Sequence, residues 1–336
     1  MSPAMTVSVE QKQRNPPVAV KMPAYFCIAQ NRMAKIGCGN SARHLYSPPL
    51  MAHTHNPEAD QLLDKEFKVL DKGFVRLIDY MGSDSSIVQA ARVSYGEGTK
   101  KVTEDRGLIR YLMRHKHTTP FEMVEFKFHV KLPIFVARQW IRHRTANVNE
   151  YSGRYSIMKE EFYMPERSDI RYQSTVNKQG RSEEEVPDSL KQEILDYLKS
   201  NQEETYGRYM KYVDQGLARE LARISLPLSL YTEWYWKIDL WNLFHFLHLR
   251  MDPHAQKEIR DYGLVMSDIV KTVAPMAHEA FMDYVVNAVY FSAPELAAIR
   301  EQLMSKAFDR DGLVSAGLSK READEMILKL GKIRGE

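Results

Sequence analysis

The stretch EFKFHVKLPIFVARQWIRHR, residues 125–144, holds the clearest change of pattern in the chain. In its first part Phe126, Phe128 and Val130 alternate with polar residues, which predicts a strand with one buried face. Pro133 comes next, and because a proline at the first helical position loses no hydrogen bond, a helix is expected to follow it. The stretch therefore predicts a half-buried strand that passes directly into a helix.

Weaker signals before this stretch indicate further strands and helices. The segment FKVLDKGFVRLIDY, residues 67–80, alternates apolar and polar residues, which predicts a strand or a strand pair with one buried face. Residues 82–85 form a predicted turn into a helix. Residues 105–115 place apolar side chains at spacings of three to four, which predicts an amphipathic helix.

Helical patterns dominate the second half of the chain. Polar residues 165–202 predict a loop that leads into a helix from Asp188, and Asp252-Pro253 is typical of a cap followed by a first helical residue. The predicted helices are 192–224, 232–249, 252–271, 281–290 and 294–332. Because strands come early and long helices late, the predicted fold class is α+β and not an alternating parallel fold.

The composition excludes several classes of protein. The 336 residues are 44% hydrophobic and 27% charged, and 47 basic against 44 acidic side chains give no field that predicts a nucleic-acid partner. No apolar run approaches the roughly 18 residues of a spanning helix, so a cytoplasmic protein is expected. The two cysteines, Cys27 and Cys38, both precede Met51. A catalytic body that begins near Met51 therefore has no thiol nucleophile, disulfide framework or thiolate metal site.

The N-terminal segment differs from the rest of the chain. Glu10 is the only acid among the first fifty residues, and no signal-peptide block of apolar residues is present. We expect a disordered extension, while an organelle-targeting presequence and a true start at Met51 remain open. The predicted domains are residues 1–55 (extension), 56–292 (main domain, with a polar excursion at about 166–190) and 293–336 (helical tail).

The densest group of polar side chains lies near the end of the opening stretch. Gln139 and Arg142 are i,i+3 neighbours on the predicted helix and are expected to face one ligand. His143 and Arg144 point elsewhere on that helix. The later turn Ser152–Arg154 offers backbone N–H groups, a hydroxyl and a guanidinium, which suit a phosphate. The alternative interpretation is a solvated basic helix end followed by a polar loop.

A second polar group surrounds Arg250, at the end of an apolar and aromatic helix. The helix dipole favours a cation there by about 0.3 to 1 kcal/mol, so a capping charge is one interpretation. The other is that the helix delivers the guanidinium into a pocket. His245, His248 and His254 lie nearby, but their spacing lacks an HExxH-type arrangement, and no metal site is expected.

The remaining candidates are smaller. In HKHTTPFE, residues 115–122, Thr119 and Glu122 fit a capping box, whereas His117 has no structural explanation. Ser94 is a further hydroxyl beside a turn glycine. The chain has no GxGxxG after a strand, no GxxxxGK[ST] and no GxSxG motif. The candidate residues include several arginines but no pair of groups suited to general acid–base catalysis. They indicate that the protein binds polyanionic ligands and that a cofactor performs the chemical step.

These motifs together resemble those of one family. Arg142-His143-Arg144, seven further residues and then Ser152 match the signature of the flavin-dependent thymidylate synthases. The segments AARVSYG, HTTPFE, LARISLPLSLYTE and FLHLRMDPHAQ each resemble family blocks and follow in the same order. The resemblance extends from about Phe67 to Tyr290.

The resemblance implies a fold, an assembly and an activity. The fold is an antiparallel sheet with long packed helices, and the assembly is a homotetramer with active sites formed between subunits. The reaction is the reductive methylation of dUMP to dTMP, with methylenetetrahydrofolate as carbon donor and NADPH as the reductant of a bound FAD. Neither a nucleic acid nor a membrane is an expected partner.

The resemblance also assigns site residues by position. The dUMP-contacting positions are Gln139, Arg142, Glu150, Ser152, Gly153, Arg154, Arg223 and Arg250. The FAD-contacting positions are Ser94, His117, Thr119, Arg142, His143, Arg144, Glu150, Asp239 and His245. Arg250 is implied to be catalytic, because it promotes ionisation of the uracil ring. Family members often carry a hydrogen-bonding side chain where Trp241 stands, so Trp241 is expected to supply packing or a backbone contact.

The implied chemistry needs no covalent nucleophile from the protein. A serine without a partnered base is a weak nucleophile, so Ser152 is expected to position dUMP without forming an adduct. The absence of cysteine after Cys38 fits a mechanism in which flavin and arginines replace a thiolate. Two other functions remain open: a polynucleotide-binding module whose arginines and aromatic rings grip phosphates and bases, and a flavoprotein of the same fold without synthase activity.

Overall fold

The computed structural model describes residues 56–93, 105–175, 178–293 and 309–334. The chain divides into two units, Met1–Pro49 and Leu50–Glu336, and every described residue belongs to the second unit. The predicted N-terminal extension, Ser94 and the first part of the predicted tail lie outside the described residues.

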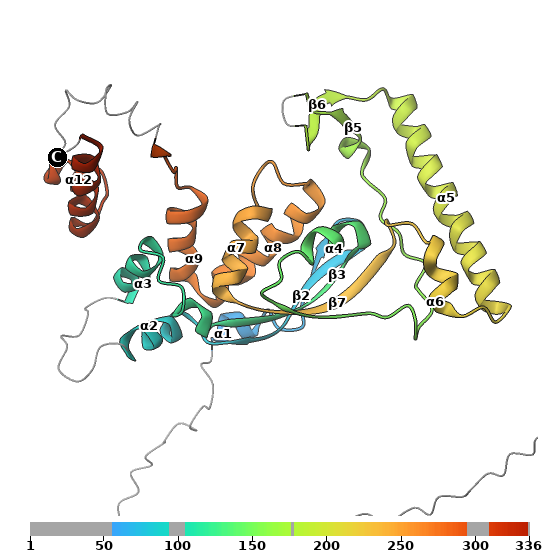
Figure 1. The fold of residues 1–336 in the computed structure, drawn as a ribbon, viewed down its shortest axis with the longest axis horizontal. Coiled ribbons are helices and arrows are strands. Elements are labelled where there is room, and N and C mark those ends of the chain that lie inside the picture. The colour runs from blue at the N-terminus through green and yellow to red at the C-terminus, as the bar shows by residue number, and fades with distance from the viewer. Residues whose placement is uncertain (1–55, 94–104, 176–177, 294–308, 335–336) are drawn as a thin grey trace, which may run out of the picture. The chain divides into compact units, whose positions relative to one another are not determined.

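A five-stranded antiparallel sheet organises the second unit (Figure 1). Its strands, in spatial order, are β1 (Glu66–Val69), β2 (Gly73–Met81), β3 (Glu125–Pro133), β7 (Tyr231–Asp239) and β4 (Asn147–Glu150). β3 and β7 pair over nine residues, from Glu125 opposite Asp239 to Pro133 opposite Tyr231. The predicted α+β class with an antiparallel sheet is confirmed, and the segment predicted as a strand pair forms β1 and β2.

The prediction of a helix over residues 232–249 is wrong for its first half, which forms the strand β7. Trp234, Trp236 and Ile238 are buried on one face of the sheet, whereas Tyr235 between them is exposed. Buried residues therefore recur at every second position, as in a strand. The period is not evident in the sequence, because the many aromatic residues of this segment also occur at helical spacings. The helix α7 spans only Leu240–Arg250, and it begins where the Asp239 carboxylate accepts a hydrogen bond from the Asn242 backbone N–H at 2.9 Å.

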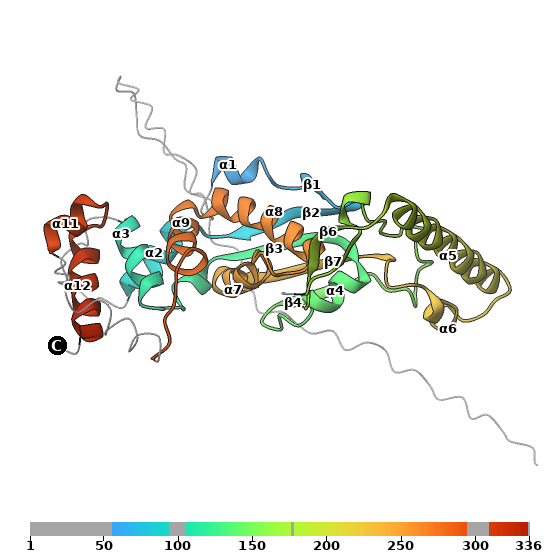
Figure 2. The ribbon, with the colours of Figure 1, turned by 90° about the horizontal axis from the view of Figure 1, so that it is seen from above.

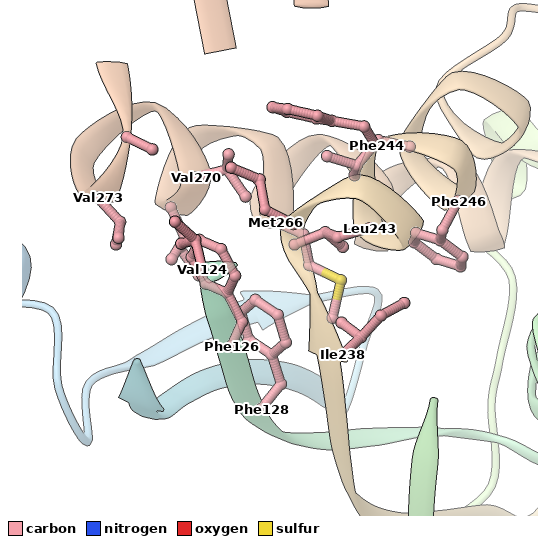
Figure 3. Close-up of a cluster of buried hydrophobic side chains, with 14 of the residues drawn as sticks. Val124, Phe126, Phe128, Ile238, Leu243, Phe244, Phe246, Met266, Val270 and Val273 are labelled. Carbon is pink, nitrogen blue, oxygen red and sulfur yellow. The ribbon is translucent and has the colours of Figure 1, made fainter. Parts of the chain in front are cut away.

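The main hydrophobic core lies between one face of this sheet and the helices α7 and α8 (Lys257–Val273). Phe126, Phe128 and Ile238 project from the sheet, and Leu243 of α7 and Met266 of α8 meet them (Figure 3). The short helix α4 (Ile134–Trp140) covers the same face at the far end of β3, with Trp140 fully buried. The sheet therefore carries α4, α7 and α8 on one side (Figure 1).

Three predicted helix starts or ends are displaced. Pro133 is the last residue of β3, and the first helical residue is Ile134. α8 begins at Lys257 and not at Asp252, because the Asp252 carboxylate accepts from the His254 N–H at 2.7 Å and closes a turn. The predicted helix 281–290 instead consists of the end of α9 (Pro275–Phe281) and a π-helical turn, Met282–Val286.

The predicted helix 192–224 is also divided. α5 spans Asp188–Asp214 and starts where the sequence predicts, but it ends just before Gly216, whose φ of +82° favours glycine. The polar excursion before α5 contains a two-stranded hairpin that the sequence did not predict. The other elements are α1 (Pro57–Asp60), α2 (Asp84–Val93), α3 (Asp105–Arg114), η1 (Phe121–Met123), η2 (Arg167–Asp169), β5 (Arg171–Gln173), β6 (Arg181–Glu185), α6 (Arg219–Ala222), η3 (Arg223–Ser225), α11 (Arg310–Ser315) and α12 (Lys320–Arg334).

The two faces of β7 predict opposite responses to truncation. Trp236→Ala removes a fully buried ring and should lower the free energy of unfolding by about 3 to 5 kcal/mol. Lys237→Ala removes an exposed side chain from the other face and should cost about 1 kcal/mol or less. Urea unfolding followed by circular dichroism measures both values. Equal losses of unfolding free energy in the two variants would contradict the strand register.

Candidate functional site

The pairing of β3 with β7 brings the ends of two helices together. α4 begins after Pro133 and α7 begins after Asp239, and these residues lie at opposite ends of the nine-residue ladder. Both helices return over the same face of the sheet, and the ring of Trp140 at the end of α4 contacts Phe246 of α7 at a centroid distance of 4.6 Å. The residues after α4 therefore meet the last turn of α7.

A cavity of about 410 Å³ lies at this meeting point and is here called the arginine pocket. It is lined by Arg142, His143, Arg144, Thr145, Ile238, Asn242, His245, Leu249 and Arg250. No carboxylate is among these lining residues, and within the described part of the chain neither Arg142 nor Arg144 has an ion-pair partner. Three guanidinium groups without a carboxylate make the pocket suited to an anionic ligand.

Arg250 is held by a neutral histidine. Its Nε–H donates to Nε2 of His143 at 3.1 Å, so His143 accepts at Nε2 and carries its proton on Nδ1. Burial and the positive charge of Arg250, followed by His245 and Arg142, lower the pKa of His143 to about 4. Burial and the charge of Arg142 also lower the pKa of Arg250. The histidine thus orients the guanidinium without neutralising it, and the remaining N–H groups of Arg250 stay available.

The expected helical pairing of Gln139 with Arg142 is wrong. α4 ends at Trp140, and Arg142 lies in the turn beyond it, so the two residues are not i,i+3 neighbours on a helix. Arg142 lines the arginine pocket, whereas the Gln139 side-chain amide donates to Oε1 of Gln256 in the segment before α8. The helix stops early because the chain must turn to enter β4.

A second group of expected residues forms around the turn Ser152–Arg154. Gly153 is buried against Arg223, and a Cβ on it would lie 3.1 Å from Cδ of Arg223 and 2.6 Å from Sδ of Met158. A side chain at this position would therefore force the Met158 side chain to move and would press on Arg223. Arg154 pairs with Glu220 of α6 at 3.2 Å, and Ser152 Oγ accepts from the Arg154 N–H at 3.3 Å. We call Ser152–Arg154 and Arg223 the glycine turn.

The glycine turn and the arginine pocket lie at different ends of β4 and β7. Asn147 pairs with Lys237 near the pocket, while Glu150 pairs with Trp234 and the Tyr151 N–H donates to the Glu233 carbonyl at 2.8 Å. Five extended residues from Asn147 to Ser152 span about 16 Å. α6 and α7 lie on different sides of the middle of β7 in both ribbon views (Figures 1 and 2). One chain does not bring the two groups into one pocket.

The other expected residues occupy structural positions near these groups. Glu150 Oε1 accepts from Oγ1 of Thr232 at 2.8 Å, and Asp239 caps α7. His117 and Thr119 lie exposed in the turn between α3 and η1. The predicted capping box is wrong, because the N-cap of η1 is Pro120, no side chain caps it, and the Glu122 N–H donates to the Thr119 carbonyl.

A smaller and more apolar cavity adjoins the arginine pocket and is here called the aromatic pocket. Its volume is about 160 Å³, and its lining is Met113, Trp241, Asn242, Phe244, His245, His248, Phe281 and Val285. It shares Asn242 and His245 with the arginine pocket. A flat apolar ring system joined to phosphate groups fits this pair of cavities, with the ring against aromatic side chains and the phosphates against guanidinium groups.

Sequence reasoning missed Asn242, which lines both cavities. Its position three residues before His245 on α7 is the signal that places both side chains on one helix face. Trp241 packs against Phe121 at a centroid distance of 5.9 Å and also lines the aromatic pocket, so its expected role towards a flavin stays a prediction.

In the described ranges, no group of three or more His, Cys, Asp or Glu side chains is arranged to hold a metal ion. None of the helices in these ranges is both long enough and apolar enough to cross a membrane.

Comparison with known proteins places the chain among nucleotide-modifying enzymes. The family model described as "Thymidylate synthase complementing protein" matches residues 76–276. The flavin-dependent thymidylate synthase of Treponema denticola is 66% identical over 244 residues, which cover 73% of this chain and 92% of that protein. The protein of the same name from Wolbachia pipientis wMel is 55% identical over 275 residues, which cover 82% of this chain and 95% of that protein.

Among solved structures, a pyrimidine-nucleotide methylase has a similar fold. The UMP/dUMP methylase PolB from Streptomyces cacaoi is 33% identical, with a TM-score of 0.59, and the match covers 66% of this chain and 98% of that chain. That enzyme was crystallised with 5-Br UMP and with 5-Br dUMP.

The pKa of His143 predicts a specific pH dependence. In the unfolded chain this imidazole takes up a proton near pH 6.5, whereas in the folded chain it does so near pH 4. The folded state therefore loses the stability associated with neutral His143 as the pH falls from 6.5 to 4. His143→Gln should show a shallower fall in the free energy of unfolding over this window. Histidine NMR, with the variant to assign the signal, should place the His143 midpoint near 4; a midpoint near 6.5 would contradict this environment.

Proposed function

The chain belongs to the thymidylate synthase complementing protein family, the flavin-dependent thymidylate synthases, and we propose that it converts dUMP to dTMP by reductive methylation. The observation that carries the proposal is the arginine pocket, where three guanidinium groups and a neutral histidine meet beside an aromatic cavity. The enzyme is a methyltransferase that depends on a flavin. We propose FAD as that flavin, methylenetetrahydrofolate as the carbon donor and NADPH as the reductant.

Arg250 is the residue that we assign to activation of the pyrimidine. The hydrogen bond to His143 holds its Nε, so the terminal N–H groups are left to face the ring. A guanidinium at the uracil edge stabilises the negative charge that forms as N3 loses its proton, and this charge raises the nucleophilicity of C5. A neutral His143 does not compete for that negative charge.

The remaining nucleotide contacts divide between the two groups described above. Arg142 and Arg250 act at the arginine pocket, and Gln139 contacts the nucleotide from the last turn of α4, outside the lining of that pocket. Ser152, Gly153, Arg154 and Arg223 of the glycine turn hold the phosphate. Each charge-assisted hydrogen bond from Arg154 or Arg223 is worth about 1.5 to 3 kcal/mol. Glu150 lies between the groups and orients the backbone of β4 through Thr232.

The pair of adjoining cavities fits a flavin dinucleotide. The residues proposed to hold it are Ser94, His117, Thr119, Arg142, His143, Arg144, Glu150, Asp239 and His245. The aromatic pocket takes the ring, and Arg142 and Arg144 offer unpaired cations to its phosphates. When bound, the reduced flavin supplies the hydride of the reaction.

We propose that the enzyme is a homotetramer with shared sites. The separation of about 16 Å along β4 between the arginine pocket and the glycine turn supports this proposal. A nucleotide whose ring faces Arg250 of one chain meets the glycine turn of a second chain. Each subunit then contributes half of two different sites, as a symmetric assembly permits.

The direct test of function is dTMP formation from dUMP with the folate, NADPH and FAD supplied. Arg250→Ala should lower kcat by about 10²-fold or more, because it removes charge stabilisation from the activated ring. Arg208 is an exposed residue of α5 whose one ion-pair partner within the described residues is Glu204. Arg208→Ala is therefore the matched control and should leave kcat unchanged. The flavin that is bound to the purified protein and released from it on denaturation should be FAD. A flavin-loaded chain that forms no dTMP would identify a relative without synthase activity and contradict the proposal.

The absence of a covalent nucleophile gives a second test. The Cys27→Ser/Cys38→Ser double variant should retain dTMP formation, since no step uses a thiolate. Ser152→Ala should raise KM for dUMP while leaving measurable turnover, because the hydroxyl positions the nucleotide. Mass spectrometry should detect no dUMP adduct on the protein. Complete loss of turnover in Ser152→Ala at saturating dUMP, with dUMP and FAD binding unchanged, would instead identify Ser152 as a nucleophile.

A further inference from the structure

The polar excursion before α5 is attached to the main domain by a buried carboxylate. Glu258, in the first turn of α8, is 1% exposed. One of its oxygens, Oε1, accepts from Arg181 at the start of β6 and from the Tyr163 hydroxyl at 2.9 Å. Burial raises the pKa of Glu258, but the hydrogen bond and charge of Arg181, together with hydrogen bonds from the Glu258 backbone and from Gln256, outweigh burial, so the net pKa shift is downward and the carboxylate is ionised.

The second oxygen of Glu258 starts a chain of hydrogen bonds that ends at Gln139, the residue proposed above to contact dUMP. Oε2 accepts from Nε2 of Gln256 at 2.9 Å, and Oε1 of Gln256 accepts in turn from Nε2 of Gln139. We call Arg181, Glu258, Gln256 and Gln139 the amide chain. Gln256 is also the residue before the first turn of α8, and its carbonyl accepts from the Arg260 N–H at 3.1 Å, so its backbone is fixed.

The direction of each hydrogen bond in the amide chain follows from chemistry. An ionised carboxylate only accepts, so Gln256 must turn its NH₂ group towards Glu258 and its oxygen away from it. Gln139 must then donate its own NH₂ group to that oxygen. The groups of Gln139 left without a partner in the amide chain are its carbonyl oxygen, Oε1, and the second N–H of its NH₂ group, and of these only the oxygen can accept a hydrogen bond.

We propose that the amide chain fixes Gln139 as a hydrogen-bond acceptor for dUMP, and that Arg181 of the excursion is a positioning residue for nucleotide binding. The inference rests on the proposed function, because Gln139 is assigned to dUMP there. The nucleotide offers two donors of the required chemistry, the N3–H of the ring and a hydroxyl of the sugar. The excursion thereby acts on nucleotide affinity although it forms no part of either cavity lining described above.

A purely structural role predicts different behaviour. If Arg181 and Glu258 only anchored the hairpin, then any loosening of the hairpin would have the same effect on dUMP binding. Arg171 supplies the matched control, because it holds the same hairpin through the carbonyls of Ser168 at 3.0 Å and Glu183 at 2.6 Å and touches no member of the amide chain.

The test is a double-mutant cycle measured as dUMP affinity by calorimetry on the flavin-loaded enzyme. Gln139→Leu and Gln256→Leu should each weaken dUMP binding about tenfold, and the double variant should be no weaker than either single variant. Arg181→Ala should weaken binding about three- to tenfold, with partial rescue in Arg181→Lys. Arg171→Ala should leave affinity within about twofold. Flavin content and the thermal midpoint report folding in every variant.

Two dUMP analogues identify the donor that Gln139 accepts. N3-methyl-dUMP lacks the ring donor, and 2′,3′-dideoxyuridine monophosphate lacks the sugar donor. The analogue without the relevant hydrogen should bind the unsubstituted chain and Gln139→Leu equally well. If both analogues still distinguish the two proteins, the proposed orientation of the amide is wrong.

The remaining outcomes separate this inference from the proposed function. The amide chain would be overturned if the loss of dUMP affinity in Gln139→Leu/Gln256→Leu equalled the product of the two single losses. It would also be overturned if folded Gln256→Leu bound dUMP with unchanged affinity. In both cases dTMP formation could persist, so the proposed function would stand. Equal losses in Arg171→Ala and Arg181→Ala would also overturn the amide chain and leave only an anchoring role. An unsubstituted enzyme that binds no dUMP would overturn the proposed function, and the inference with it.

Discussion

The pairing of β3 with β7 is the constraint on which the rest of the structure depends. Nine residues of each strand lie opposite one another, and one face of the pair is filled by aromatic side chains that α7 and α8 cover. Because α4 follows β3 and α7 follows β7, this ladder fixes where both helices start and therefore where they end. A slip of one residue would turn Trp236 towards solvent and separate His143 from Arg250.

The charge in the arginine pocket is maintained because the local histidine is neutral. Burial and the neighbouring guanidinium groups oppose a proton on His143, and the neutral ring can accept a hydrogen bond from Arg250. A carboxylate in its place would hold the arginine more strongly but would cancel its charge. The pocket thus combines an oriented guanidinium with a field that attracts the phosphates and the developing charge of an anionic substrate.

Much of the fold could be predicted from local pattern, and the failures have physical reasons. The strand from Glu125 and the helix from Asp188 follow from alternation and turn chemistry, which act over few residues. The sequence of β7 suggests a helix because aromatic residues occur on both faces of the strand. Its period of two becomes evident only when the strand is seen paired between β3 and β4. The amide at Gln139 meets Gln256, more than a hundred residues away, and no local pattern carries that contact.

One chain carries two halves of the proposed nucleotide site, and these halves do not meet within that chain. Subunit mixing tests whether two chains complete the site together. Arg250→Ala and Arg223→Ala chains, each strongly impaired alone, are co-expressed with different tags, and dTMP formation by the mixed oligomer is assayed. Shared sites predict recovery of about one quarter of the unsubstituted activity, because that fraction of sites receives both arginines. A mixed oligomer that forms and stays as impaired as the single variants would contradict shared sites.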